Sequence, residues 1–473
     1  MRDTLGGIFS DRWQWASRMF GRARLGDSRN TRRLIAMAAS AARSPGGHVS
    51  EVFRTDAERQ GAYGLLENEA VPPEAINAAM ADGTVRACVR AGLSKVYVAG
   101  DGSSIRVTDP HRCKGTGRIG SKGKARGFEV MSALALTSDG VPLGLCAQTF
   151  WARRGPPRRG SKRPPSQRES RYWDRLLDEV TAHFCNANEG ASIPCRPHFL
   201  FDRGADTWSV LRRAHALRSF ADVTVRAAQD RRVRDERALY LWEKLNCTAA
   251  CCGYLLDVPG SATRTARRAR MSVRASHVTL KLTGGEPIEL GAVLVQEVDE
   301  SPRGEEPIEW LLLTTQRLDT TADALDVVRG YCLRWRVEEF HKTWKSGLCK
   351  VESTQLRSGT VIQKWAMILG AVATRALHLT YAARTTPEVP AESEFSSDEI
   401  EAVIALRRPK GVRLDDRPSL QKVVRWIADL GGYTGKSSGG PPGAIVIGRG
   451  LRDVQAAASA IRNLREMKAN KKL

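Results

Sequence analysis

The stretch Tyr331-Cys-Leu-Arg334-Trp-Arg-Val-Glu338-Glu-Phe-His-Lys-Thr-Trp-Lys345 places an acid, two permanent cations and a phenol at helical spacing. At about 100° per residue, these four side chains fall within roughly 60° of one another on a helix. Such a face suits a metal-bound phosphodiester, because Glu338 would hold the cation while Arg334 and Lys345 neutralise phosphate oxygens. A solvated amphipathic helix has the same spacing. Aromatic residues, which a solvated face does not need, favour the first interpretation: Trp335, Phe340 and Trp344.

The charge balance points to a polyanionic partner. The chain has 473 residues and a mass of 52.0 kDa, with a net charge of +22 and a pI of about 9.9. That length predicts about two to four domains. Such an excess of positive charge opposes compaction by self-repulsion and suits a partner such as nucleic acid. An anionic membrane surface is the second candidate.

No segment is expected to span a membrane. The most apolar stretch, residues 365–383, is interrupted by Arg375 and His378 and predicts a buried helix. The first residues carry charges without a continuous apolar run, so a signal peptide is not expected. The ten cysteines show no zinc-binding pattern and are expected to be reduced thiols. These features predict a cytoplasmic, nucleoid-associated protein.

Residues 1–75 predict a basic helical domain. The helical pattern breaks at Gly26 and restarts with Asp27 or Ser28 as the cap of a second helix. Arg29 and Arg33 lie in the first turns of that second helix. Two helices joined by a short turn are typical of a helix-turn-helix. Three packed helices without a DNA role have the same pattern, so the residues alone leave both alternatives open.

From about residue 94 the pattern changes to strands. Three apolar or alternating runs predict antiparallel strands, with a hairpin turn at Asp139-Gly140. A helix, a strand, a second helix and a second strand follow, which predicts a mixed sheet covered by helices. The expected strands are residues 96–101, 128–136, 143–150, 197–202 and 221–226.

Three domains are therefore expected. Residues 76–385 would form an α/β domain, and short strands over residues 230–315 would form a β-rich insertion within it. Two of these short strands would begin at Met271 and at Val278. The helix that bears Glu338 follows the insertion. Residues 386–473 would form a helical C-terminal domain.

Two polybasic loops flank the first strands. They span residues 111–126 and 152–171, and the second holds eight Arg or Lys residues, one Glu and four prolines. Gly and Pro keep such segments extended, and their Lys and Arg residues have phosphate affinity through counterion release. A solubilising loop has the same composition. Their position beside the expected catalytic sheet favours contact with DNA.

Three acids are candidates for a metal-dependent phosphoryl-transfer site, which needs carboxylates from different elements. Asp101 ends an apolar strand, Asp202 interrupts another, and Glu338 lies on the helix described above. An acid within a buried strand is costly unless it is paired or metal-bound. Each acid alone is equally consistent with a strand-end residue or a helix cap.

In this order, the acids and the helix resemble those of bacterial cut-and-paste DDE transposases of the insertion-sequence family numbered four. The family signature is Tyr-x-x-Arg-x-x-x-Glu-x-x-x-x-x-x-Lys, and the opening stretch matches it. The resemblance covers most of the chain. Its further parts are Leu25-Gly-Asp-Ser-Arg-Asn-Thr-Arg-Arg-Leu34, Gln60-Gly-Ala-Tyr63 and Ile308-Glu-Trp-Leu-Leu-Leu-Thr314.

The resemblance implies an RNase H-like catalytic core with Asp101, Asp202 and Glu338 as the metal-binding catalytic triad. The β-rich insertion would lie between the second aspartate and the glutamate. The N-terminal domain would bind DNA and the C-terminal domain would form a homodimer. Gly204 stands where the family commonly has Glu, and that departure removes no metal ligand.

The resemblance also implies DNA contacts. Tyr331, Arg334 and Lys345 would bind phosphates of the transposon end near a flipped base, on which Trp310 would stack. Arg226 would be a basic residue of the same region. Two N-terminal arginines, Arg29 and Arg33, would recognise end sequences.

The implied reaction is cut-and-paste transposition of double-stranded DNA. Two Mg²⁺ ions, with Mn²⁺ as a possible substitute, would support cleavage at the inverted repeats through a hairpin intermediate and joining of the 3′ ends to target DNA. The alternative is a catalytically silent DNA-binding repressor derived from a transposase. A structure-specific nuclease that cuts without joining is a third possibility. The sequence leaves open the terminal repeat, the target preference and whether the element is mobile.

Overall fold

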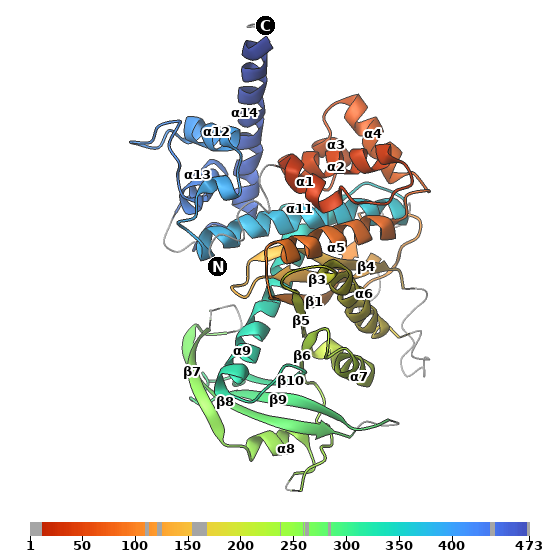
Figure 1. Cartoon of the computed structure of the whole chain (residues 1–473), viewed down its shortest axis with the longest axis vertical. Helices are drawn as coiled ribbons and strands as arrows, with labels where there is room; N and C mark the ends of the chain where they lie inside the picture. Colours follow the sequence, from red (N-terminus) through yellow and green to blue (C-terminus); the bar gives the residue numbers. More distant parts are fainter. Residues whose placement is uncertain are drawn as a thin grey trace.

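The structure is a computed structural model of the whole chain (Figure 1). In Figure 1, helix α11 (Gly359–Thr385) crosses the middle of the molecule, with the N-terminal and C-terminal helices on one side and the sheet on the other. Of the expected basic loops, residues 111–112, 121–124 and 154–167 lie outside the described part. The described residues are 12–108, 113–120, 125–153, 168–236, 238–258, 260, 264–281, 285–435 and 440–470.

A mixed sheet forms the centre of the molecule. β1 (Lys95–Arg106), β3 (Arg126–Leu136) and β4 (Pro142–Trp151) are antiparallel neighbours, with β3 between the other two. β5 (Arg196–Phe201) runs parallel to β1, and β6 (Asp222–Arg226) runs parallel to β5. The resulting order β4-β3-β1-β5-β6 is that of the expected RNase H-like core. A two-residue strand, β2 (Gly117–Arg118), pairs with the start of β3.

One face of the sheet packs against α10 (Arg336–Lys345) and α11. Tyr97 and Ala99 of β1 point to this face and share an apolar cluster with both helices. Helix α11 is long and apolar enough to cross a membrane by length and composition, but its whole apolar window is buried inside the protein. The expected buried helix is thus the central core helix.

The opposite face packs against α5 (Pro73–Arg90), α6 (Arg171–Asn188) and α7 (Trp208–Ala216). Val96 and Val98, the alternate residues of β1, contribute to this second cluster. Because helices cover both faces, a central strand can be apolar throughout rather than alternating. This explains the nearly continuous burial of β3.

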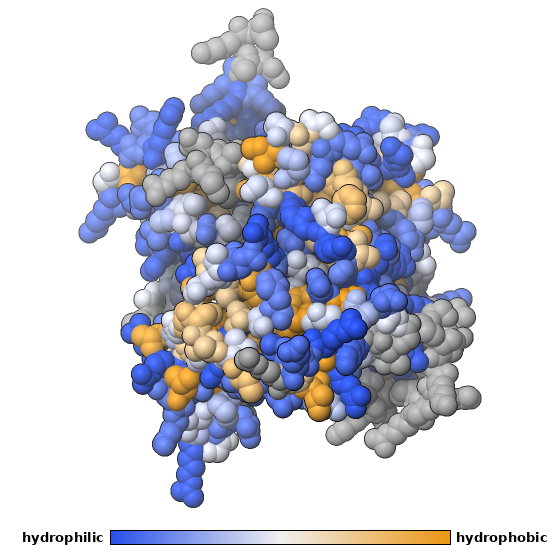
Figure 2. Space-filling model, turned by 60° about the horizontal axis from the view of Figure 1, so that its bottom comes forward, coloured by the Kyte–Doolittle hydropathy of each residue, from blue (hydrophilic) through white to orange (hydrophobic). Residues whose placement is uncertain are grey.

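The β-rich insertion extends the same sheet. β10 (Glu309–Thr314) pairs with β6, and β9 (Ile288–Glu297), β8 (Arg267–Leu280) and β7 (Ala250–Val258) follow outward. Within the described residues, ten strands thus form one sheet. Helix α9 covers one face of the insertion and α8 packs beside β8 and β9: their bounds are Thr321–Cys332 and Leu241–Asn246. Figure 2, which brings the lower end of the Figure 1 view forward, shows a mostly hydrophilic face with local apolar patches.

The N-terminal helices pack on α11. Asp27 caps α2, as the sequence indicated, and Thr55 and Glu58 form a reciprocal capping box at the start of α4. Apolar residues of these helices belong to the same cluster as those of α11. The bounds are α1 Arg12–Phe20, α2 Ser28–Arg43, α3 Val49–Val52 and α4 Asp56–Leu66.

The C-terminal helices form a separate apolar cluster with the end of α11. The last of them, α14, extends away from the body of the molecule in Figure 1. Its exposed apolar residues include Leu464 and Met467, each 58% exposed. The bounds are α12 Ser397–Arg407, α13 Leu420–Leu430 and α14 Ala444–Asn470. The expected domain boundaries near residues 75 and 385 stay predictions.

Four local expectations were wrong. The stretch that carries Tyr331 and Glu338 is not one helix, because the 3₁₀ turn Leu333–Trp335 separates α9 from α10. β1 continues past Asp101 to Arg106, and β5 ends before Asp202. The two short strands expected around residues 271 and 278 are one long strand, β8, because pairing with β9 continues through both.

Candidate active site

Asp101 and Asp202 lie on neighbouring parallel strands. Lys95 pairs with Arg196 and Ala99 with Leu200, an offset of 101 residues that places Asp202 opposite Asp101. Ala99 and Leu200 both belong to the cluster beneath α10 and α11, and side chains two positions further along point to the same face. The two carboxylates therefore point toward the helix that carries Glu338.

Each aspartate is oriented by a backbone N–H of its own chain segment. Gly102 N donates to Asp101 Oδ1 at 2.9 Å, and Gly204 N donates to Asp202 Oδ1 at 2.8 Å. Asp202 is the N-cap of a 3₁₀ turn, Arg203–Ala205. A backbone hydrogen bond therefore fixes one oxygen of each carboxylate.

Glu338 reaches the site from the first turn of α10, which packs on β1. Arg334, on the preceding 3₁₀ turn, donates to Glu338 Oε1 at 2.8 Å and lies 3.8 Å from Asp101 Oδ2. Arg334 and Glu338 thus lie on one face even though a 3₁₀ turn separates α9 from α10. Their guanidinium and carboxylate groups form a bridge from α10 to β1.

The electrostatics of the site suit a cation. Burial, and then the negative charge of Asp202, raise the pKa of Asp101 to about 7, with a further contribution from Glu338 and partial relief by Arg334. Three carboxylates with hard oxygen donors are the ligands that Mg²⁺ and Mn²⁺ prefer, and a divalent cation would relieve their repulsion. In the described part of the chain, however, no three His, Cys, Asp or Glu side chains are arranged to hold a metal. Arg334 fills the space between two of the acids, so cation binding by all three requires Arg334 to move.

Aromatic and basic side chains border the acids. Trp310, half-buried on β10, has its ring centroid 6.1 Å from that of Tyr331, at an angle of 59°. The Arg334 guanidinium lies 6.0 Å from the Tyr331 ring. Arg226, at the end of β6, donates to Glu309 O at 2.8 Å, while its buried Nε has no hydrogen-bond partner in the described part of the chain. Burial, and the charges of Arg203 and Arg334, lower the pKa of Arg226, so three cations converge here.

Lys345 lies at the other end of α10. Its Nζ donates to Ser103 Oγ at 3.3 Å and is 3.9 Å from Glu352 Oε1. Ser103 is two residues beyond Asp101 on β1, so Lys345 borders the same strand as the acids. Two of the aromatic residues expected to serve this face do not, because Phe340 and Trp344 are fully buried in the core behind it. The third, Trp335, is 57% exposed.

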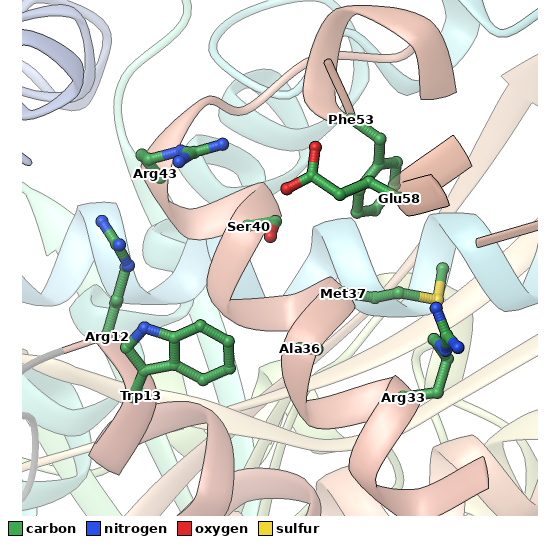
Figure 3. A pocket seen from close by; sticks show the side chains of 9 residues that line it. All are labelled: Arg12, Trp13, Arg33, Ala36, Met37, Ser40, Arg43, Phe53 and Glu58. Carbon is green, nitrogen blue, oxygen red and sulfur yellow. The ribbon is translucent and has the colours of Figure 1, made fainter. Parts of the chain in front are cut away.

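The two N-terminal arginines lie on α2, outside this group of acids. Arg29 pairs with Asp27, the cap of its own helix, at 2.8 Å. Arg33 lines a cavity of about 170 Å³ between α2 and the neighbouring helices, which Figure 3 shows from close by. The other lining residues are Arg12, Trp13, Ala36, Met37, Ser40, Arg43, Phe53 and Glu58.

Two residues of the site were not predicted. Arg203 follows Asp202 directly and adds positive charge near Arg226, and Ser103 receives Lys345. Both residues follow one of the two aspartates closely in the sequence, and this proximity could have identified them as residues of the site. The structure brings together all the expected residues of the core, namely Asp101, Asp202, Glu338, Tyr331, Arg334, Lys345, Trp310 and Arg226.

Comparison with known protein families gives three matches. Residues 12–71 match a transposase DNA-binding domain, residues 98–374 a transposase DDE domain, and residues 371–469 a transposase Tn5 dimerisation domain. The DDE match covers more than half of the chain, so the chain belongs to the transposase DDE family. It is a transposase with DNA-binding and Tn5-type dimerisation domains, and DDE domains generally use divalent metal ions.

One solved structure is also similar. It is described as a cryo-EM structure of a piggyBac transposase synaptic complex with hairpin DNA. The sequence identity is 8% and the TM-score 0.38, over 80% of this chain and 77% of that chain.

Proposed function

We propose that this transposase performs cut-and-paste transposition, with Asp101, Asp202 and Glu338 as its catalytic acids. The observation that carries the proposal is that β1, the end of β5 and α10 direct these three carboxylates toward one another. Burial, and then the charge of Asp202, raise the pKa of Asp101 to about 7. Strongly perturbed carboxylates are typical of functional sites. We also propose that the chain is related to the transposase of the kanamycin-resistance composite transposon, because the stretch Arg334 to Lys345 nearly repeats that relative's helix signature.

The three acids would hold two Mg²⁺ ions, with Mn²⁺ as a possible substitute. When bound, such ions lower the pKa of an attacking water and stabilise the leaving oxyanion. The fit rests on the oxygen donors and on the burial and carboxylate repulsion that together raise the pKa of Asp101. It also requires Arg334 to release Glu338, and an incoming phosphate is a suitable new partner for that guanidinium.

The basic side chains would position the DNA strand. Arg334 lies one turn before Glu338 and Lys345 lies about two turns after it, and the two cations would contact phosphates on either side of the scissile bond. The buried Nε of Arg226, which has no hydrogen-bond partner among the described residues, would donate to a phosphate if the side chain moves toward the DNA. Trp310 and Tyr331 would receive an unstacked base, since an aromatic face stacks on any base.

The reaction would proceed by successive displacements at phosphorus. Water attacks the phosphodiester at the transposon end and releases a 3′-hydroxyl. This hydroxyl attacks the opposite strand to form a hairpin, which expels the flanking DNA. A second water opens the hairpin, and the 3′-hydroxyl finally attacks target DNA. Each step makes one P–O bond and breaks one, so no covalent protein–DNA intermediate is needed.

The flanking domains would assemble the complex. Arg29 and Arg33 would recognise the inverted repeats, and the C-terminal helices would join two chains on a pair of DNA ends. The net charge of +22 would add affinity for phosphates that does not depend on sequence. We place this complex in the cytoplasm, on the nucleoid.

The test uses the purified chain, Mg²⁺ and linear DNA that carries the repeats flanking the coding region. Nicked, hairpin and target-joined products are expected from the unaltered chain, and only bound DNA from Glu338→Gln. Binding without any cleavage by the unaltered chain would favour the silent repressor. Cleavage without joining would indicate a nuclease.

A further inference from the structure

A buried ion pair lies four residues beyond Asp202. Arg231 Nη1 is 2.7 Å from the Asp206 carboxylate, and the two side chains are 1% and 0% exposed. Asp206 Oδ2 also accepts from Ala228 N at 2.7 Å and from Gln229 N at 3.0 Å. The Asp206 main-chain oxygen accepts from Arg231 Nη2 at 3.0 Å. Asp206 is therefore bonded through both its side chain and its backbone.

This pair connects the two segments that leave β5 and β6. On one side is the 3₁₀ turn Arg203–Ala205, which is closed by Ala205 N to Asp202 O and by Asp206 N to Arg203 O, each 3.2 Å. On the other side are Ala228 and Gln229, which follow the end of β6. The turn begins at Asp202, and β6 ends at Arg226.

A third element holds Arg231. Its guanidinium carbon lies 4.3 Å above the ring of Trp208, at the start of α7. Arg231 thus contacts the turn after β5 and the first residue of α7 at once. A guanidinium that is stacked and also paired has one orientation, because both its plane and its edge are fixed.

We infer that Asp206 and Arg231 are positioning residues that fix the Asp202 carboxylate in the place needed for cation binding. This inference rests on the proposed function. The physical reason is that the turn between Asp202 and Asp206 is short and hydrogen-bonded, so a displacement of Asp206 moves Asp202. Supporting partners of a metal ligand typically change metal affinity about 10- to 100-fold when they are lost.

The same two strands offer a matched control. Asp222 and Arg196 join the starts of β6 and β5 by two hydrogen bonds of 2.7 and 2.9 Å. This pair also links an aspartate to an arginine across β5 and β6, but at the ends opposite to Asp202. Asp222→Asn therefore removes an equivalent charge without touching the turn that carries Asp202.

The experiment compares Asp206→Asn with Asp222→Asn in the full-length chain. Mn²⁺ binding is measured by electron paramagnetic resonance of the free ion, and DNA affinity is measured in EDTA. For Asp206→Asn we expect an Mn²⁺ dissociation constant raised about tenfold, a matching rise in the Mg²⁺ needed for cleavage, and DNA affinity within twofold of the unaltered chain. Asp222→Asn should change neither constant. An Asp206→Asn chain that folds and binds Mn²⁺ within twofold of the unaltered chain would overturn the inference.

If Asp206→Asn does not fold, Trp208→Leu tests the same point more mildly, because it removes only the ring that supports Arg231. It should raise the Mn²⁺ dissociation constant in the same direction, by about threefold, and no change would again overturn the inference. Failure of the proposed function is a distinct result. In that case the unaltered chain itself neither binds Mn²⁺ at the three acids nor cleaves DNA.

Discussion

Asp202 and Asp206 lie at the two ends of one short turn, yet their surroundings differ completely. Asp206 is 2% exposed, and an arginine and two backbone N–H groups compensate its charge. Asp202 lies beside Asp101, and the nearest ion-pair partner of these two acids among the described residues is Arg334, at 3.8 Å from Asp101. The charge of Asp206 is compensated within the fold, whereas Asp202 repels the carboxylate of Asp101.

Asp206 therefore contributes to the stability of the fold, whereas Asp101 and Asp202 carry a repulsion that a bound cation would relieve. A buried carboxylate is tolerated when an opposite charge compensates it, as Arg231 does for Asp206. Burial, and then repulsion by Asp202, raise the pKa of Asp101, and a bound cation would relieve that unfavourable free energy. Removing a charge should therefore have opposite effects on stability at the two places.

The largest expected effect is the loss of cleavage in Glu338→Gln. Removal of one carboxylate from the cluster should cost about 5 kcal/mol of transition-state stabilisation, or roughly 10⁴-fold in the rate of end cleavage. Glu339→Gln is the control, because that neighbour bonds to Tyr381 at 2.5 Å and lies 3.5 Å from Arg336 instead. Cleavage by the control should stay within about threefold. More than a tenth of the activity remaining in Glu338→Gln would contradict the assignment.

Asp206→Ala should have the largest effect on stability. It leaves Arg231 charged and buried without a partner, which typically costs about 3–5 kcal/mol in the free energy of unfolding. Asp222→Ala, in a pair whose arginine is 35% exposed, should cost about 1 kcal/mol. Urea unfolding followed by circular dichroism measures both. Equal losses would remove the distinction between the two ends of the sheet.

Asp101→Asn should change stability in the opposite direction. The pKa of Asp101 is about 7 in the folded chain and 3.8 in the unfolded chain, so the folded state binds this proton more tightly. The stabilisation that results from the bound proton is fully present below pH 3.8 and is lost as the pH rises through 7. Without divalent cations, Asp101→Asn should therefore be more stable than the unaltered chain at pH 8, by about 2 kcal/mol after allowance for solvent screening. The difference should shrink at pH 5. A less stable Asp101→Asn at pH 8 would show that its charge is compensated.

Trp310→Ala should have the smallest effect. Loss of base stacking costs about 1–2 kcal/mol, which should lower the rate of hairpin formation about tenfold while the first nick is retained. Trp310→Phe keeps an aromatic face and should restore most of that rate. Gel analysis of nicked and hairpin products gives both values. Equal loss of nicking and hairpin formation in Trp310→Ala would argue against a base-stacking role.

Much of the fold could be predicted from the sequence, because covered strands appear as apolar runs. The runs at residues 128–136 and 143–150 fall within β3 and β4, and Gly140 has the positive φ, +78°, that their hairpin turn favours. The break before Arg336 could not be predicted. Arg336 Nε donates to the main-chain oxygen of Gly140, a contact across 196 positions that helical periodicity does not contain.

The candidate site was predictable only in part. The family resemblance supplied Asp101, Asp202 and Glu338, and parallel pairing explains why the first two are neighbours. Periodicity misplaced Phe340 and Trp344, because the same helical spacing generates a core face and a functional face. The pair of Asp206 and Arg231 was missed because it depends on how two loops meet, which no local pattern records.

The most direct test of the central claim is the position of Mn²⁺ in crystals of the chain with its end DNA, located by anomalous diffraction. We expect Mn²⁺ between Asp101, Asp202 and Glu338, with Arg334 moved from Glu338 to a DNA phosphate. Mn²⁺ bound only elsewhere, with the Arg334–Glu338 bond of 2.8 Å retained on bound DNA, would contradict the account.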